Sequence, residues 1–255
     1  MRTSRTICAA AIAMAVIAVA CVATKSNAAT SVEAAIQASA KQNRYVFVTF
    51  YKSNDSASKS MQATVKSIRG KLAGRADFVS VDVGNQANRA IISRYGADRS
   101  PMPLTIVLAP NGAITAGFPQ QIKNTDMSSV FVSDGMASVL KVLQSGKIAA
   151  VCLQNSKTKH NKESLAAAQG LKNQAQFRGA VEIVKIDPSD RGESDLMKRC
   201  QVDTTSTDAQ IVVIAPPGKV MGKFGGTVTT NSMTSALTKA FSGSGCSGAS
   251  GCCPK

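Results

Sequence analysis

The feature that most constrains the fold is an internal repeat. Thr105-Ile-Val-Leu-Ala-Pro-Asn-Gly112 and Ile211-Val-Val-Ile-Ala-Pro-Pro-Gly218 share one pattern, an apolar run of strand formers followed by Ala-Pro-x-Gly. The pattern predicts a buried strand that enters a tight turn, followed in each copy by a second short strand. A repeat of this size indicates a duplicated unit, so both halves of the chain should contain the same elements.

Hydrophobic periodicity and runs of β-branched or aromatic residues predict these elements. In the first copy we expect helices over 31–42 and about 58–72, strands over 45–51 and 77–83, a short helix over 88–95, strands over 104–108 and 113–118, and a closing helix over 129–143. In the second copy we expect strands over 147–153, 181–187, 210–214 and 220–224, and helices over 162–174, 193–200 and 233–241. Strand–helix–strand connections predict parallel pairing, and the hairpins add antiparallel strands, so each sheet should be mixed.

Corresponding elements lie about 105 positions apart, which is within the size of one small domain. We therefore divide the chain into a signal segment (1–28), a first domain (31–145), a second domain (146–241) and a Gly/Ser/Cys-rich tail (242–255).

The N-terminus has the pattern of an export signal. Residues 1–5 carry two arginines, residues 7–23 are apolar or small, and Ser26-Asn27-Ala28 suits cleavage before Ala29. A membrane anchor is less favoured, because the run is Ala-rich and short of about 20 strongly apolar residues. A lipoprotein signal acylated at Cys21 remains an alternative. We expect export to the periplasm, the cell envelope or the medium.

The full chain carries a formal charge of +15, and three of its basic residues precede Ala29. The mature chain would keep about +12, a strong basic excess for its size. After export, the partners that this charge favours are another exported protein or an anionic envelope polymer. Nucleic acid is not favoured, because no aromatic residues alternate with the only dense basic cluster, at 157–162. Membrane contact is expected only if Cys21 is lipidated.

Two segments of the first unit, 46–51 and 103–112, resemble segments of a thioredoxin-like domain. Val46-Phe-Val-Thr-Phe-Tyr51 resembles the central strand that leads to the redox loop of this family. Pro103, followed by an apolar strand and a Pro-Asn-Gly turn, resembles the segment that holds the family's cis-proline and final hairpin. The second copy has Ala209 or a neighbour in the place of this proline, so it is the more degenerate unit. The resemblance implies an α/β fold of two tandem thioredoxin-like domains, each a mixed sheet flanked by helices.

The chain departs from the family at the place of the Cys-x-x-Cys motif, where it has Asp55-Ser-Ala-Ser58 in the first copy and residues 155–160 in the second. Dithiol exchange needs a thiolate at a helix N-terminus and a second thiol that resolves the mixed disulfide. A serine hydroxyl cannot replace either thiol. We interpret Asp55 and Ser58 as helix-capping residues, and we expect His160 on the surface rather than in a hydrolytic triad.

The resemblance implies a different role for Met102 and Pro103. In this family a cis-proline beside the redox loop leaves backbone groups free to pair with an extended peptide. If the Met102-Pro103 bond is cis, the first unit could keep a peptide-docking edge without redox chemistry. The alternative is that Pro103 only shapes the entry of the strand.

The mature cysteines form two groups. Cys152 and Cys200 lie in a predicted strand and helix, where buried thiols are usual, and a disulfide between them needs Cα atoms within about 7 Å. Cys246, Cys252 and Cys253 come together in the tail. Three thiolates suit Cu(I) or Zn(II), while a disulfide, an interchain crosslink or disulfide exchange are equally open.

The sequence thus favours an exported binding or assembly module that is not an enzyme. The alternative is a thiol-based function, soft-metal binding or disulfide exchange, in the cysteine-containing tail.

Overall fold

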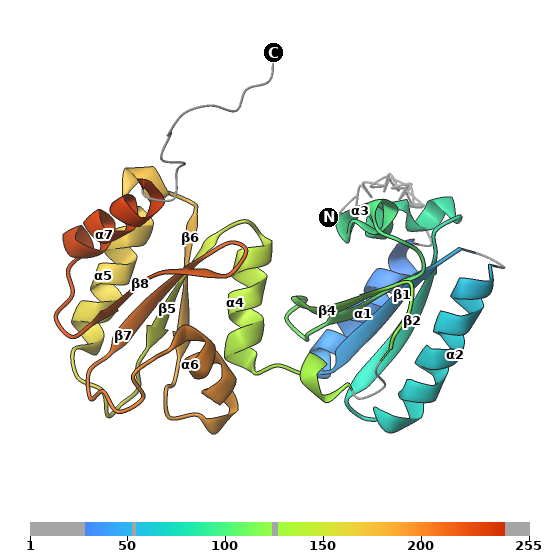
Figure 1. Cartoon of the computed structure of the whole chain (residues 1–255), viewed down its shortest axis with the longest axis horizontal. Helices are drawn as coiled ribbons and strands as arrows, with labels where there is room; N and C mark the ends of the chain where they lie inside the picture. Colours follow the sequence, from blue (N-terminus) through green and yellow to red (C-terminus); the bar gives the residue numbers. More distant parts are fainter. Residues whose placement is uncertain (1–28, 53–54, 124–126, 243–255) are drawn as a thin grey trace, which may run out of the picture.

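The computed structural model describes residues 29–52, 55–123 and 127–242 (Figure 1). The elements are, in order, α1 (Ala29–Lys41), β1 (Tyr45–Tyr51), α2 (Ser56–Lys71), β2 (Ala76–Asp82), α3 (Arg89–Arg94), β3 (Leu104–Leu108), β4 (Ile114–Pro119), α4 (Asp134–Gln144), β5 (Ile148–Leu153), α5 (Asn161–Asn173), β6 (Val181–Ile186), α6 (Ser194–Cys200), β7 (Gln210–Ala215), β8 (Lys219–Gly225) and α7 (Thr230–Ser242).

The strands form two sheets of the same topology, with the orders β2-β1-β3-β4 and β6-β5-β7-β8. In each sheet the two N-terminal strands are parallel, and the following hairpin adds two antiparallel strands. Helices cover both sheets (Figure 1). The expected duplication and the mixed α/β sheets are therefore confirmed.

The central strands explain why each sheet is covered on both faces. In β1 the five residues between Tyr45 and Tyr51 are all buried, and in β5 all six residues are buried. Because side chains alternate along a strand, Phe47 packs on the α2 side while Val48 and Phe50 pack with the core near α1 and α3. A continuous apolar run on this central strand thus contributes side chains to the cores on both faces of the sheet.

Helix α4 packs differently from our expectation for residues 129–143. We expected this helix to close the first unit, but its buried Val139 and Leu143 belong to the core of the second sheet, together with β5, β6 and β7. Only its other side reaches the first unit, where Ala137 packs against Ala109 and Ala113. In Figure 1, α4 lies between the two sheets. The division after residue 145 remains a prediction, and this packing favours a boundary nearer Ser133.

With α4 counted in the second unit, each unit runs helix, strand, helix, strand, helix and hairpin. The second unit then adds α7, whose Met233 and Leu237 are fully buried against α5 and the sheet. In the first unit the matching face is covered by the segment after β4, through Ile122, Met127 and Val130. The two copies therefore close the same face with different structures.

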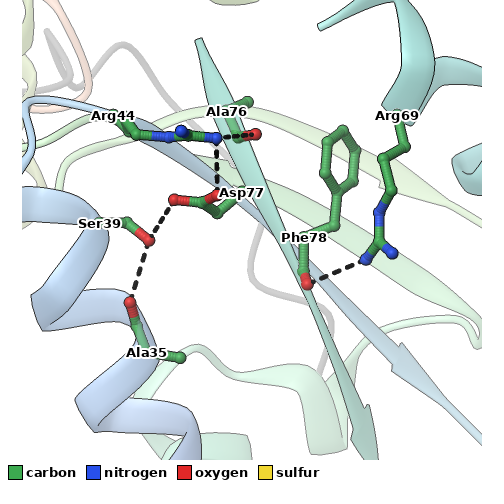
Figure 2. A network of polar contacts seen from close by, with 7 residues as sticks. All are labelled: Ala35, Ser39, Arg44, Arg69, Ala76, Asp77 and Phe78. Carbon is green, nitrogen blue, oxygen red and sulfur yellow. Dashed lines mark hydrogen bonds and ion pairs between the residues drawn. The ribbon is translucent and has the colours of Figure 1, made fainter. Parts of the chain in front are cut away.

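The repeat extends to one ion pair. Asp77, the second residue of β2, pairs with Arg44 at 2.7 Å, and Glu182, the second residue of β6, pairs with Lys147 at 2.7 Å. Both basic residues directly precede the neighbouring parallel strand. Figure 2 shows that the Arg44 guanidinium also donates to the Ala76 carbonyl, while the Ser39 hydroxyl donates to Asp77 at 2.7 Å. Exposed pairs of this kind contribute about 0–1 kcal/mol each, so we assign them mainly a role in strand register.

Arg69 of α2 contacts β2 from the other face of this strand. Its guanidinium donates to the carbonyl of Phe78 at 3.3 Å and lies 5.3 Å from the centroid of the Phe78 ring (Figure 2). The two arginines therefore bind β2 from opposite faces.

Side-chain contacts fix the segment that joins the units. The Tyr45 hydroxyl donates to the Val132 carbonyl at 2.8 Å and accepts from the Val132 N–H at 3.0 Å. The Gln144 amide makes the same double contact, at 2.7 and 2.9 Å, with the backbone of Ile114 on edge strand β4. These contacts satisfy backbone groups that an edge would otherwise expose.

Glu193, just before α6, is the third link. It is buried, and its carboxylate accepts from the Gly135 N–H at 2.7 Å and from the Ser133 hydroxyl at 2.6 Å. These two hydrogen bonds connect the N-terminus of α4 to the residue that precedes α6.

None of the helices in the described ranges is long and apolar enough to cross a membrane.

Candidate functional site

The candidate site is the N-terminus of α2 in the first unit, the place of the family's redox loop. Asp55 is the N-cap residue: its carboxylate accepts from the Ser58 N–H at 2.6 Å and from the Ser58 hydroxyl at 2.8 Å. The Ser58 hydroxyl accepts in turn from the Lys52 N–H at 3.3 Å. The hydrogen bonds from the backbone and then the hydroxyl of Ser58 lower the pKa of Asp55. The capping interpretation of these two residues is therefore confirmed.

The Met102-Pro103 segment lies beside this helix end. Leu104, directly after Pro103, pairs with Phe50, and β1 continues from Phe50 toward α2. The Met102-Pro103 peptide bond is cis. Pro103 is buried, and its carbonyl accepts from the Gln120 N–H at 2.6 Å. Met102 is half-buried, and its backbone makes no hydrogen bond to the described part of the chain.

Two buried hydroxyls lie under the site. Thr49 and Thr105 are paired residues of β1 and β3, and their oxygens are 3.0 Å apart. Both side chains are almost fully buried. Because each hydroxyl satisfies the other, the polar pair is tolerated in the core and holds β1 and β3 in register where the site begins.

The loop before α5 in the second unit is also held by oxygen side chains, although the N-cap residue of this helix, His160, makes no side-chain cap hydrogen bond. The Thr158 hydroxyl donates to the Asn161 side chain at 2.6 Å and accepts from the Asn155 N–H at 2.8 Å. This matches the Lys52, Ser58 and Asp55 contacts in the first unit, so both helix ends carry oxygen side chains in the place of the family's thiols. The sequence did not indicate this equivalence, because the side chains differ and only their contacts correspond.

The edge that corresponds to Met102 is occupied in the second unit. The Lys159 N–H donates to the Thr207 carbonyl at 2.9 Å, and the Lys159 carbonyl accepts from the Ala209 N–H at 2.9 Å. Lys159 and Asp208 thereby form an isolated parallel β-bridge. Since Gln210 pairs with Leu153 as Leu104 pairs with Phe50, Asp208 is the counterpart of Met102. Sequence patterns could not predict this bridge, which uses only backbone groups.

His160 follows Lys159 directly and has a left-handed backbone (φ 59°). Its Nε2 lies 4.0 Å from the carboxylate of Asp208 in the same unit. This contact gives no support to a hydrolytic triad with Asp55 and Ser58.

The structure does not join Cys152 and Cys200 in a disulfide. Both are free and buried, Cys152 in the core on the α5 and α7 side of the sheet and Cys200 in the core on the α4 and α6 side. The disulfide that the sequence allowed is thus absent, because the sheet separates the two thiols. Burial raises the pKa of Cys152 to about 11 and also raises the pKa of Cys200, so both thiols are protonated at neutral pH.

The remaining predicted site residues, Cys21, Cys246, Cys252 and Cys253, lie outside the described residues. Within the described ranges, no three His, Cys, Asp or Glu side chains are grouped so that they could hold a metal ion. Copper or zinc at the tail stays an expectation from the sequence.

No family model and no curated protein matches the chain. Among solved structures, the germline-specific thioredoxin Deadhead of Drosophila melanogaster is 26% identical, covers 35% of this chain and 79% of its own, and has a TM-score of 0.31. The N-terminal domain of the alkylhydroperoxide reductase AhpF of Enterococcus faecalis is 15% identical, with coverages of 81% and 98% and a TM-score of 0.29. The first two thioredoxin domains of Eps1p of Saccharomyces cerevisiae are 10% identical, with coverages of 77% and 92% and a TM-score of 0.27.

The TM-scores are low, so the assignment depends on the topology of the chain itself. Both sheets have the same strand order, the same single parallel pair and the same C-terminal hairpin, and helices flank each of them. The two mixed sheets and their flanking helices fit two tandem thioredoxin-like folds.

Proposed function

We propose that the protein is an exported binding or assembly module that does not catalyse dithiol exchange. In this proposal the Met102-Pro103 edge of the first unit binds an extended segment of another exported protein. The second unit does not bind in this way, because its own backbone occupies the corresponding edge.

The oxygen side chains at both helix ends support the lack of dithiol exchange. Asp55 and Ser58 in one unit, and Thr158 and Asn161 in the other, stand where the chemistry needs two thiols. The two described thiols are buried with raised pKa, which disfavours the thiolate that attacks a disulfide.

The contacts of Lys159 carry the binding proposal. Its two backbone hydrogen bonds to Thr207 and Ala209 support the proposal, because they pair one residue of the chain's own backbone with this edge. The same edge of the first unit has the half-buried Met102 in place of Asp208, and it would receive a partner's backbone in the place that Lys159 occupies. Main-chain hydrogen bonds of this kind supply affinity with little dependence on the sequence of the bound segment.

The charge of the chain suggests the chemistry of the partner. The basic excess of the chain, +15 in full and about +12 without residues 1–28, favours acidic segments and speeds their encounter with the edge. An anionic envelope polymer would share this attraction but could not form the β-type bridge. Export is part of the proposal and depends on the signal pattern in residues 1–28.

Photocrosslinking at matched positions tests the binding site. A benzoylphenylalanine is placed at position 102 in one variant and at position 208 in another, and each is irradiated with reduced, carboxymethylated insulin B chain as an extended acidic peptide. We expect crosslinking at position 102 and little at position 208, where Lys159 already pairs with the edge. Equal crosslinking at both positions, or none at position 102, would contradict the proposal.

A further inference from the structure

The second unit contains a recess that is separate from the proposed peptide-binding edge of the first unit. It lies between α4, α6 and the β7–β8 hairpin, on the sheet face opposite α5 and α7, and has a volume of about 420 Å³. Ligand sites usually have volumes of about 300–1,000 Å³, so the recess can hold a small molecule.

The walls of the recess are apolar. They include Val139 and Leu143 of α4, Leu196 and Cys200 of α6, and Ile214 and Val220 of the hairpin. Five of these side chains, from the three elements α4, α6 and β7, belong to one core and are buried, while Val220 is half-buried at the rim. An apolar ligand that enters the recess would therefore extend the core of the second unit.

Among the described residues that line the recess, Arg199 is the only charged one. It is exposed, and in the described part of the chain no carboxylate lies within ion-pair distance of its guanidinium. A guanidinium at the edge of an apolar cavity is suited to a carboxylate, which it can bind through two parallel hydrogen bonds.

A second hollow lies next to the recess. It shares Met136, Leu140 and Arg199 with the recess and is otherwise more polar, with Ser129, Ser133 and Asp195 among its lining residues. The apolar recess and the polar hollow are therefore neighbours, and Arg199 is among the lining residues of both. A ligand that matches the recess has an apolar chain and a negatively charged head.

We propose that the recess binds a single-chain fatty acid, with the acyl chain between α4, α6 and the hairpin and the carboxylate paired with Arg199. The chain gains from burial by about fourfold in affinity for each methylene that is fully buried. The carboxylate fixes the orientation, since Asp195 in the polar hollow would repel an anion placed farther out. This inference is independent of the peptide edge in the first unit.

Isothermal titration calorimetry with octanoate, decanoate and dodecanoate tests the proposal on the purified chain. We expect one site whose affinity rises with chain length, and weaker binding of dodecyltrimethylammonium, which has the same chain and the opposite charge. Arg199→Gln should weaken dodecanoate binding about tenfold. Lys198→Gln removes a charge from the neighbouring exposed position, which does not line the recess, and should change affinity less than about twofold.

Val220→Trp tests the location, because the indole would fill the recess from its rim. Circular dichroism verifies that the variant is folded, and Val220→Phe replaces it if it is not. We expect loss of dodecanoate binding with the fold retained. The proposal is overturned if dodecanoate does not bind at about 1 mM, if binding survives the filled recess, or if Arg199→Gln and Lys198→Gln have equal effects.

Discussion

Gly135→Ala probes the link between α4 and the second unit. A Cβ atom at this position would lie 2.6 to 2.7 Å from the three carboxyl atoms of Glu193, far closer than van der Waals contact. Glu193 is 5% exposed and surrounded by packed elements, so its carboxylate can move away only by giving up its hydrogen bonds to Gly135 and Ser133.

The expected loss of stability follows from these two hydrogen bonds. Each hydrogen bond to a charged group contributes about 1.5–3 kcal/mol to stability. The higher helix propensity of alanine relative to glycine offsets about 1 kcal/mol of the loss. We therefore expect Gly135→Ala to lower the free energy of unfolding by about 2–5 kcal/mol, measured by urea unfolding followed by circular dichroism.

Gly70→Ala is the matched control. Gly70 also lies in a helix, α2, but a Cβ atom there meets no atom of the described residues within 4 Å. The free energy of unfolding should rise by about 0.5–1 kcal/mol. A double-mutant cycle adds specificity, since Gly135→Ala should cost little once Glu193→Ala has removed the carboxylate. A Gly135→Ala variant as stable as the wild type would refute the reasoning.

Two further predictions concern Glu182 and Gln144. Lys147 and Lys172, hydrogen-bonded to the Glu182 carboxylate, lower its pKa to about 2. Because the folded pKa lies below the unfolded value, this contribution is present above about pH 4.5 and is lost as the pH falls toward 2. Glu182→Gln should thus cost up to about 1 kcal/mol at pH 7 and nothing near pH 2, and a pH-independent difference in urea unfolding would contradict this. Gln144→Ala removes both contacts with the Ile114 backbone, so hydrogen exchange should show faster exchange of the Ile114 amide; an unchanged rate would mean that the side chain does not protect edge strand β4.

The sequence predicted the local elements well because burial and periodicity coincide in them. The strand over residues 45–51 and its repeat over 147–153 are continuous apolar runs, and both became central strands buried on two faces. The departure at Asp55-Ser-Ala-Ser58 was visible because the chemistry of the family requires thiols there. Its capping role followed from the residue types alone.

The placement of α4 could not be predicted from the sequence. Val139 and Leu143 lie on one face of the helix whichever sheet they cover, so the periodicity of the pattern carries no information about the partner. The segment that replaces a closing helix in the first unit was missed for a related reason. Two of its buried residues, Met127 and Val130, are three positions apart as in a helix, so their spacing does not reveal that the segment contains only a short 3-10 turn there.

The occupied edge of the second unit was also invisible to sequence analysis. Lys159 lies in the dense basic cluster at 157–162, and its side-chain type gives no indication that its backbone pairs with the edge at Asp208. Any residue with a free N–H and carbonyl could form these bonds, so residue type gives no signal.

Reduction of insulin disulfides by dithiothreitol, followed by turbidity, is the most direct test of the central claim. The chain is assayed beside a thioredoxin that has both active-site thiols, and a second sample carries Cys246→Ser, Cys252→Ser and Cys253→Ser to separate the tail from the two domains. The account predicts that this second sample leaves the rate at that of dithiothreitol alone, because Asp55, Ser58 and their counterparts offer no thiol. Acceleration near the rate of the thioredoxin control would contradict it.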